Sequence, residues 1–138
     1  MRSLSAKAVS AIFMGAALAV ALIGFAWNTA REGRQIRDHA AAITGGDPVR
    51  GAAMFIRYGC GSCHTVTGVR TAIGNVGPPL DDVATRVIIA GRFANTPQNM
   101  EHWIRQPQQV SPGTAMPNLN VSGGDARDIT AFLYTRTK

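Results

Sequence analysis

The feature that most constrains this chain is the segment Cys60-Gly61-Ser62-Cys63-His64, in which a histidine directly follows two cysteines spaced two residues apart. This pattern is the attachment signature of c-type haem: the two thiols form thioethers with the haem vinyl groups, and the imidazole becomes an iron ligand. We therefore predict one covalently bound haem c, held by Cys60, Cys63 and His64, with its iron bound by His64.

Three other interpretations of the cysteine pair are less favourable. A thioredoxin-like redox pair would lie in a βαβ context, which the sequence does not show. A zinc site needs about four ligands, and the sequence offers only the two cysteines and the scattered histidines His39, His64 and His102. A structural disulfide across the short loop is the simplest alternative, but it leaves the histidine after Cys63 unexplained.

The charge of the chain does not indicate a nucleic-acid partner. The 14 Lys and Arg residues exceed the 8 Asp and Glu residues by six, but residues 1–46 contribute half of this excess. Two haem propionates would lower the charge of the remaining residues to about +1. The sequence also lacks a basic stripe with interleaved aromatic residues, so we expect no nucleic-acid binding.

Near the N-terminus, an uncharged stretch of 20 residues from Ala8 to Trp27 follows Arg2 and Lys7. This stretch is long enough to cross a bilayer as a helix. We predict a cytoplasmic N-terminus at residues 1–7 and a single transmembrane anchor at residues 8–27. The alternative is a cleaved secretory signal, which would have a shorter apolar region and a clear small-residue cleavage site, whereas Trp27 suits a membrane interface.

Positive charges flank the apolar stretch on both sides, so they do not decide its orientation in the membrane. Arg2 and Lys7 precede it, and Arg31, Arg34 and Arg37 follow it. In c-type cytochromes the haem is attached outside the cytoplasmic membrane. We therefore expect a single-pass protein of the bacterial inner membrane, with its haem domain on the periplasmic or outer side.

Helix signals divide the rest of the chain into a tether at residues 28–46 and a haem domain at residues 47–138. The anchor helix is predicted to continue to about Ala42, before a glycine pair breaks it. Asp47-Pro48 begins a helix that runs to about Tyr58, Thr96-Pro97 begins a second, and Ser122 caps a third. Short helical turns are expected at residues 81–90. No β-hairpin signal is present, and the predicted fold class is all-α.

The first and last of these helices are expected to cross and close the domain. Gly51 would permit the close approach of another helix. The C-terminal helix presents an apolar face at i, i+3 and i+4, formed by Ile129, Phe132 and Leu133.

A low-spin iron also needs a sixth ligand, for which the candidates downstream of His64 are Met100, His102 and Met116. Met116 is favoured because it lies in a loop stiffened by Pro112 and Pro117, without helical periodicity. A thioether opposite an imidazole raises the reduction potential and denies the iron to oxygen. The alternatives are a loop methionine that merely packs, or a haem enzyme or gas sensor in which Met116 is off the iron or readily displaced.

Several motifs together resemble a class I, mitochondrial-like monohaem cytochrome c over nearly all of residues 47–138. The resemblance implies a cytochrome c fold around one haem, in which the Pro78 carbonyl accepts a hydrogen bond from the His64 ring. It also implies that Arg86 lies near a haem propionate and that Trp103 is a haem-facing aromatic residue. The motifs are Gly51 with Phe55, Cys60 to His64, Gly77-Pro78-x-Leu80, Arg86, Pro112-Gly113-x-x-Met116-Pro117 and Ala131-Phe132-Leu133.

More narrowly, parts of residues 58–117 resemble the cytochrome c domain fused to subunit II of some bacterial haem-copper oxidases. The fit is partial, because both cysteines are used for haem and leave no thiolates for a dinuclear copper site. The only lysines are Lys7 and Lys138, so docking would use arginines or an apolar surface; the candidate arginines are Arg57, Arg70, Arg92 and Arg105.

The expected function is non-enzymatic: a membrane-anchored cytochrome passes single electrons from a quinol-oxidising complex or dehydrogenase towards a terminal haem-copper oxidase. The alternative is a permanent haem subunit of a larger oxidase or dehydrogenase complex. In either case the haem supplies the redox chemistry, and the protein buries it, fixes its ligands and exposes one edge.

Overall fold

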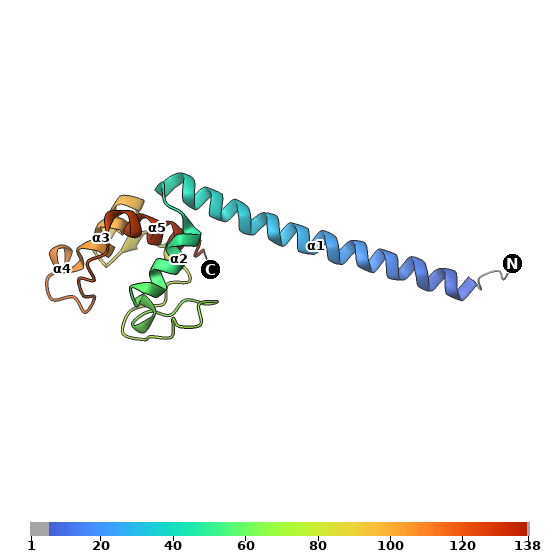
Figure 1. The fold of residues 1–138 in the computed structure, drawn as a ribbon, viewed down its shortest axis with the longest axis horizontal. Coiled ribbons are helices and arrows are strands. Elements are labelled where there is room, and N and C mark those ends of the chain that lie inside the picture. The colour runs from blue at the N-terminus through green and yellow to red at the C-terminus, as the bar shows by residue number, and fades with distance from the viewer. Residues whose placement is uncertain (1–5, 138) are drawn as a thin grey trace. The chain divides into compact units, whose positions relative to one another are not determined.

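The computed structural model describes residues 6–137 and divides between Gln35 and Ile36 into two compact units. The predicted N-terminal segment, residues 1–7, lies mostly outside the described residues. Helix α1 (Ala6–Thr44) makes up the described part of the N-terminal unit and continues into the C-terminal unit, where all other helices and strands of the described chain lie (Figure 1).

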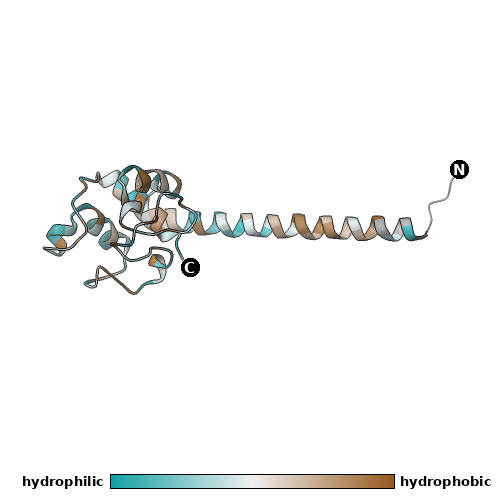
Figure 2. Cartoon of the chain, turned by 90° about the horizontal axis from the view of Figure 1, so that it is seen from below, coloured by the Kyte–Doolittle hydropathy of each residue, from teal (hydrophilic) through white to brown (hydrophobic). Residues whose placement is uncertain are grey.

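Helix α1 is long and apolar enough, over the segment that begins at Ile12, to cross a membrane, and the described side chains of this apolar part are exposed. Figure 2 shows its apolar residues as brown bands along the helix. At the end of the uncharged stretch, the guanidinium groups of Arg31 and Arg34 lie 5.8 and 5.9 Å from the Trp27 ring centroid. The division into anchor and tether at Trp27 stays a prediction.

The end of α1 packs within the C-terminal unit, where Ala40 is fully buried. The helix stops at Thr44, two residues beyond the predicted end. The Thr44 hydroxyl donates to the Ala40 carbonyl, and Gly45 adopts a left-handed conformation with φ of 70°. This glycine therefore ends the helix as glycines commonly do, because it lacks the Cβ that makes positive φ costly.

The C-terminal unit is mostly helical, which confirms the predicted all-α class. Three of its helices begin where the sequence predicted: the Asp47, Thr96 and Ser122 side chains accept hydrogen bonds from backbone N–H groups in the first turns of α2, α3 and α5. In chain order the elements are α2 (Pro48–Arg57), the 3-10 helices η1 (Cys60–Ser62) and η2 (Val83–Thr85), strands β1 (Ile88–Ile89) and β2 (Phe93–Ala94), α3 (Pro97–Arg105), α4 (Pro107–Val110) and α5 (Gly123–Tyr134).

Helices α2 and α5 pack closely, as the sequence predicted, and Gly51 makes their contact possible. A Cβ at position 51 would lie 1.9 Å from the Asp128 backbone oxygen and 2.9 Å from the Cβ of Phe132. One turn further along α2, the rings of Phe55 and Phe132 pack in a tilted arrangement with centroids 5.5 Å apart. Both rings belong to the hydrophobic core of the unit.

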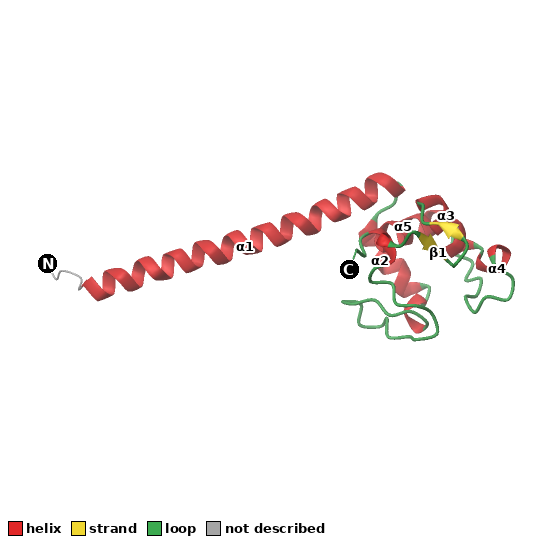
Figure 3. Cartoon of the chain, turned by 180° about the vertical axis from the view of Figure 1, so that it is seen from behind, coloured by secondary structure: helices red, strands yellow, loops and turns green. Residues whose placement is uncertain are grey.

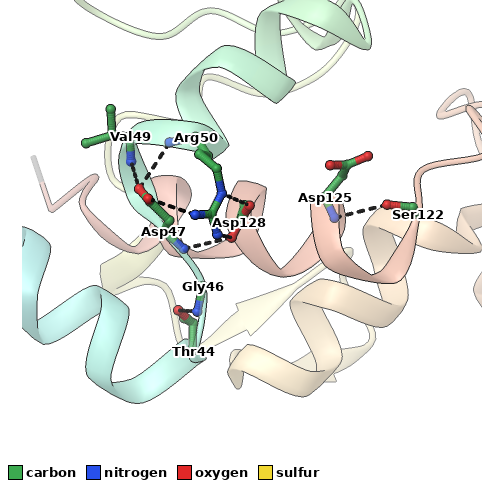
Figure 4. Close-up of polar contacts among 8 residues, drawn as sticks. All are labelled: Thr44, Gly46, Asp47, Val49, Arg50, Ser122, Asp125 and Asp128. Carbon is green, nitrogen blue, oxygen red and sulfur yellow. Dashed lines mark hydrogen bonds and ion pairs between the residues drawn. The ribbon is translucent and has the colours of Figure 1, made fainter.

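A polar cluster holds the start of α2 against α5 (Figure 4). The buried Asp128 carboxylate accepts hydrogen bonds from the Asp47 backbone N–H at 2.7 Å, and from Nε and Nη2 of Arg50 at 2.8 and 3.1 Å. The bonds from Arg50 hold the pKa of Asp128 below its usual range. Asp47 in turn caps α2 and pairs with Arg50.

The sequence analysis found no hairpin signal, but β1 and β2 form a small antiparallel hairpin (Figure 3). Ile88 pairs with Ala94, and Ile89 with Phe93. Its turn uses positive φ at Ala90 (54°) and Gly91 (65°), and strands of two residues are too short to show an alternating pattern. Residues 81–90 therefore contain a 3-10 turn and a strand, where only helical turns were expected.

We predict that Gly51→Ala lowers the free energy of unfolding by about 2–3 kcal/mol, because the added methyl group must push α2 away from the α5 backbone. The measurement is urea unfolding of the detergent-solubilised holoprotein, followed by circular dichroism. Gly124→Ala, in α5 with open space around its Cβ position, is the control and should be neutral or slightly stabilising. Equal stability of the two variants would contradict the close helix contact.

We also predict that Asp128→Asn lowers the free energy of unfolding by about 1–3 kcal/mol at pH 7, because Arg50 loses the closer of its two carboxylate partners. The depressed folded pKa of Asp128 stabilises the protein above the unfolded pKa of about 4. This stabilisation is lost as pH falls through the folded pKa, so the gap between wild type and variant should close in acid. Unfolding curves from pH 7 to pH 3 test this, with exposed Asp38→Asn as control; a pH-independent gap would contradict it.

Candidate functional site

A cavity of about 560 Å³ opens in the C-terminal unit and brings together residues from most of its length. Cys60, Cys63 and His64 line it, and so does Met116, more than fifty positions later. The volume lies within the range of cofactor pockets, roughly 300–1,000 Å³. Most of the remaining wall is apolar and includes Phe55, Leu80, Val83, Met100, Ile104, Ile129 and Leu133.

The cysteine segment forms the single turn η1, which places both thiols at the cavity. The turn follows Gly59, whose φ is 71°, and the His64 N–H donates to the Cys60 carbonyl at 3.0 Å. The two cysteines form no disulfide with each other, so the disulfide alternative is not favoured. Burial raises the pKa of Cys60 to about 11, which keeps its thiol protonated. An activated redox thiolate has a lowered pKa, so this environment does not favour thioredoxin-like chemistry.

The His64 ring is oriented by the segment that faces it. Its Nδ1 lies 2.8 Å from the Pro78 carbonyl oxygen, which can only accept, so Nδ1 donates and Nε2 remains free to bind a metal. Gly77 makes room for the ring, because a Cβ at that position would lie 2.3 Å from Cε1 of His64. The ring occupies the space that any other residue at position 77 would fill.

Of the three candidates for a second ligand, His102 is exposed and does not line this cavity. Met100 lines it but is a core residue of α3. Met116 also lines it, from the partly buried loop between α4 and α5. The structure therefore brings Met116 and His64 to one cavity, and ligation of iron by this pair stays a prediction.

Arg86 and Trp103 also line the cavity. One Arg86 nitrogen, Nη2, donates both to the Pro79 carbonyl and to the Asp82 carboxylate. The latter bond lowers the pKa of Asp82. Arg86 is thus placed beside the segment that orients His64, while its contact with a propionate and the haem-facing role of Trp103 stay predictions.

Two polar residues that sequence reasoning did not identify support the cavity wall. The Asn95 amide donates to the carbonyls of Val83 and Arg86 at 2.7 and 2.9 Å, and accepts a hydrogen bond from the Tyr134 hydroxyl at 3.0 Å. Gln108, in α4, makes similar contacts with the loop that carries Met116. No spacing in the sequence signals either role, because most of their partners are backbone groups brought close only by folding.

The residues of the cavity fit a covalently attached haem. Two thiols, an imidazole with one free nitrogen and a thioether sulfur line one apolar space, and the ring position depends on the absence of a Cβ at Gly77. Residues 48–137 match the sequence model of the family described as cytochrome c. The chain belongs to the cytochrome c family. It is accordingly a haem-binding c-type cytochrome that takes part in electron transfer. Members of this family are electron carriers and are generally not enzymes.

The cytochrome is also similar to two curated oxidase subunits. It is 35% identical over 85 residues to cytochrome c oxidase subunit 2 of Alkalihalophilus pseudofirmus, and 38% identical over 74 residues to that of Bacillus sp. strain PS3. These matches cover 61% and 51% of this chain but only 24% and 20% of the relatives. The chain thus spans about a quarter of their length or less. No solved structure gives a significant match.

We predict that Gly77→Ala disturbs the haem site of this cytochrome, because the added methyl group and the His64 imidazole cannot share the same space. The expected result is a high-spin component in the ferric optical spectrum and a loss of about 1–3 kcal/mol of stability. Gly123→Ala, whose Cβ would make only ordinary contacts with Arg105, is the control. A Gly77→Ala spectrum identical to the control would contradict the close packing of ring and glycine.

Proposed function

We propose that this chain is a membrane-anchored cytochrome that carries single electrons in a respiratory chain, towards a terminal haem-copper oxidase. The observation that carries the proposal is the single cavity that His64 and Met116 both line, since two protein ligands leave no open iron position for catalysis. The donor would be a quinol-oxidising complex or a dehydrogenase. Helix α1 would anchor the protein in the bacterial inner membrane, with the haem domain on the outer side.

Each part of the site has a role in this function. The haem, once bound through Cys60 and Cys63, supplies a one-electron iron couple whose potential the thioether of Met116 would raise. The Pro78 carbonyl holds the His64 ring in the tautomer with Nε2 free. The apolar wall would limit the access of water to the haem, and in this way it would influence the reduction potential of the iron.

The mouth of the cavity offers an apolar surface to a redox partner. Val76 and Ile88 line the cavity and are 66% and 56% exposed, so they lie at its mouth. Val87, next to Ile88, is 82% exposed. Because the interface lysines of the wider family are missing, we propose that partner contact is mainly apolar here, with arginines around it. Small apolar contacts of this kind suit brief encounters.

The relatives favour an oxidase as the acceptor, because both matched proteins are oxidase subunits. The same similarity supports a second candidate, in which the cytochrome is a permanent subunit of an oxidase complex. The two candidates share the site and differ only in whether the cytochrome leaves its acceptor.

A haem-stained native gel separates these candidates. Membranes are washed with high salt, solubilised in mild detergent and run beside the soluble fraction, and a strain expressing Cys60→Ser with Cys63→Ser is the control for covalent haem. We expect a small membrane-derived haem band, as an anchored carrier requires, and loss of that band in the double variant.

A high-mass haem band with oxidase activity would instead identify a permanent subunit. Haem found only in the soluble fraction would contradict the anchor and identify residues 8–27 as a cleaved signal. Staining that persists in the double cysteine variant would contradict covalent attachment.

A further inference from the structure

The side chain of Gln108 makes three hydrogen bonds to the loop that carries Met116. Its Nε2 donates to the Thr114 and Met116 carbonyls, each at 2.7 Å, and its Oε1 accepts from the Gly113 N–H at 3.3 Å. The Gln108 backbone N–H adds a longer contact of 3.4 Å to the Asn118 side-chain oxygen. One residue of α4 is thus bonded to the loop on both sides of the methionine.

Only one orientation of this amide satisfies all three partners. Two of them are carbonyl oxygens, which need donors, and the third is an N–H group, which needs an acceptor. A glutamine supplies both donors and the acceptor from one planar group. Glutamate has the same size and shape but, when ionised, has no donor for either carbonyl.

Little else in the described structure holds residues 113–116. Their other hydrogen bonds are local: the Thr114 N–H donates to the Ser111 carbonyl at 3.1 Å, and the Met116 N–H to the Thr114 hydroxyl at 3.4 Å. Gly113 adopts a φ of 81°, as a tight turn requires. Among the described hydrogen bonds, those of the Gln108 side chain join residues 113, 114 and 116 to α4.

Helix α4 offers a firm base for such a contact. Pro107, immediately before Gln108, is among the largest fully buried side chains, and the Ser111 N–H closes the turn by donating to its carbonyl. Gln108 itself is partly buried, whereas the next residue, Gln109, is exposed. The two neighbouring glutamines thus differ in environment although they share type and helix.

We propose that Gln108 is the positioning residue that holds the Met116 thioether in place as the sixth ligand and so limits its displacement by other ligands. This inference rests on the proposed function, in which Met116 binds the iron. Loss of the two donated bonds would free the loop to swing away from the cavity. An external ligand would then compete more successfully for the iron.

The experiment compares Gln108→Glu with Gln109→Glu in the detergent-solubilised full-length holoprotein. Both variants add one negative charge at neighbouring positions, so Gln109→Glu is the control for the added charge. Imidazole is titrated against the ferric form, and the charge-transfer band typical of thioether-ligated ferric haem is recorded. We expect Gln108→Glu to bind imidazole at least about tenfold more tightly than wild type, with a weakened band, and Gln109→Glu to match wild type.

Two further variants make the result decisive. Gln108→Ala removes the bonds without adding charge and should also bind imidazole more tightly than wild type. It replaces Gln108→Glu in the comparison if that variant yields too little holoprotein. Met116→Ala should bind imidazole most tightly and lack the band. If Met116→Ala binds like wild type, the proposed ligation is wrong and this inference falls with it. If Met116→Ala binds tightly but the Gln108 variants match Gln109→Glu, ligation stands and the positioning role of Gln108 is overturned.

Discussion

The close contact between α2 and α5 is the constraint on which the rest of the C-terminal unit depends. It requires a residue without a Cβ at position 51, because the Asp128 carbonyl oxygen lies where that Cβ would be. The Asp47, Arg50 and Asp128 cluster holds the same contact from its polar edge. With α2 held in this way, the cysteine turn that follows it and Leu133 of α5 line the same cavity.

The cavity combines rigid apolar packing with a few backbone-directed polar contacts. Pro78 orients His64, Asn95 holds the Val83–Arg86 segment, and Gln108 holds the methionine loop. In each case a backbone carbonyl is an acceptor, so position is controlled without placing a further charge at the site. This arrangement suits a carrier whose iron must keep its ligands through repeated changes of charge, because reorganisation of the surroundings is small when the groups are already fixed.

The proposed function holds the cytochrome at a membrane surface through the apolar helix α1, which is long enough to cross a membrane. A protein held near its acceptor gains effective concentration from its anchor and depends less on long-range attraction between charges. This offers a physical reason why a cytochrome of this kind can lack a ring of lysines. The exposed residues Val76, Val87 and Ile88 near the cavity mouth agree with contact through apolar surface.

The sequence alone determined those features whose chemistry is local. The spacing of two cysteines followed by a histidine predicts haem attachment without any knowledge of the fold. Asp47, Thr96 and Ser122 begin helices because each caps N–H groups of the turn that follows it. Gly51 predicted a close helix contact, which the structure confirmed. Only the tertiary structure decided that Met116 and not His102 lines the cavity, that residues 88–94 form a hairpin, and that Asn95 and Gln108 support the site. Most partners of Asn95 and Gln108 are backbone groups, which have no residue signature and become neighbours only when the chain folds.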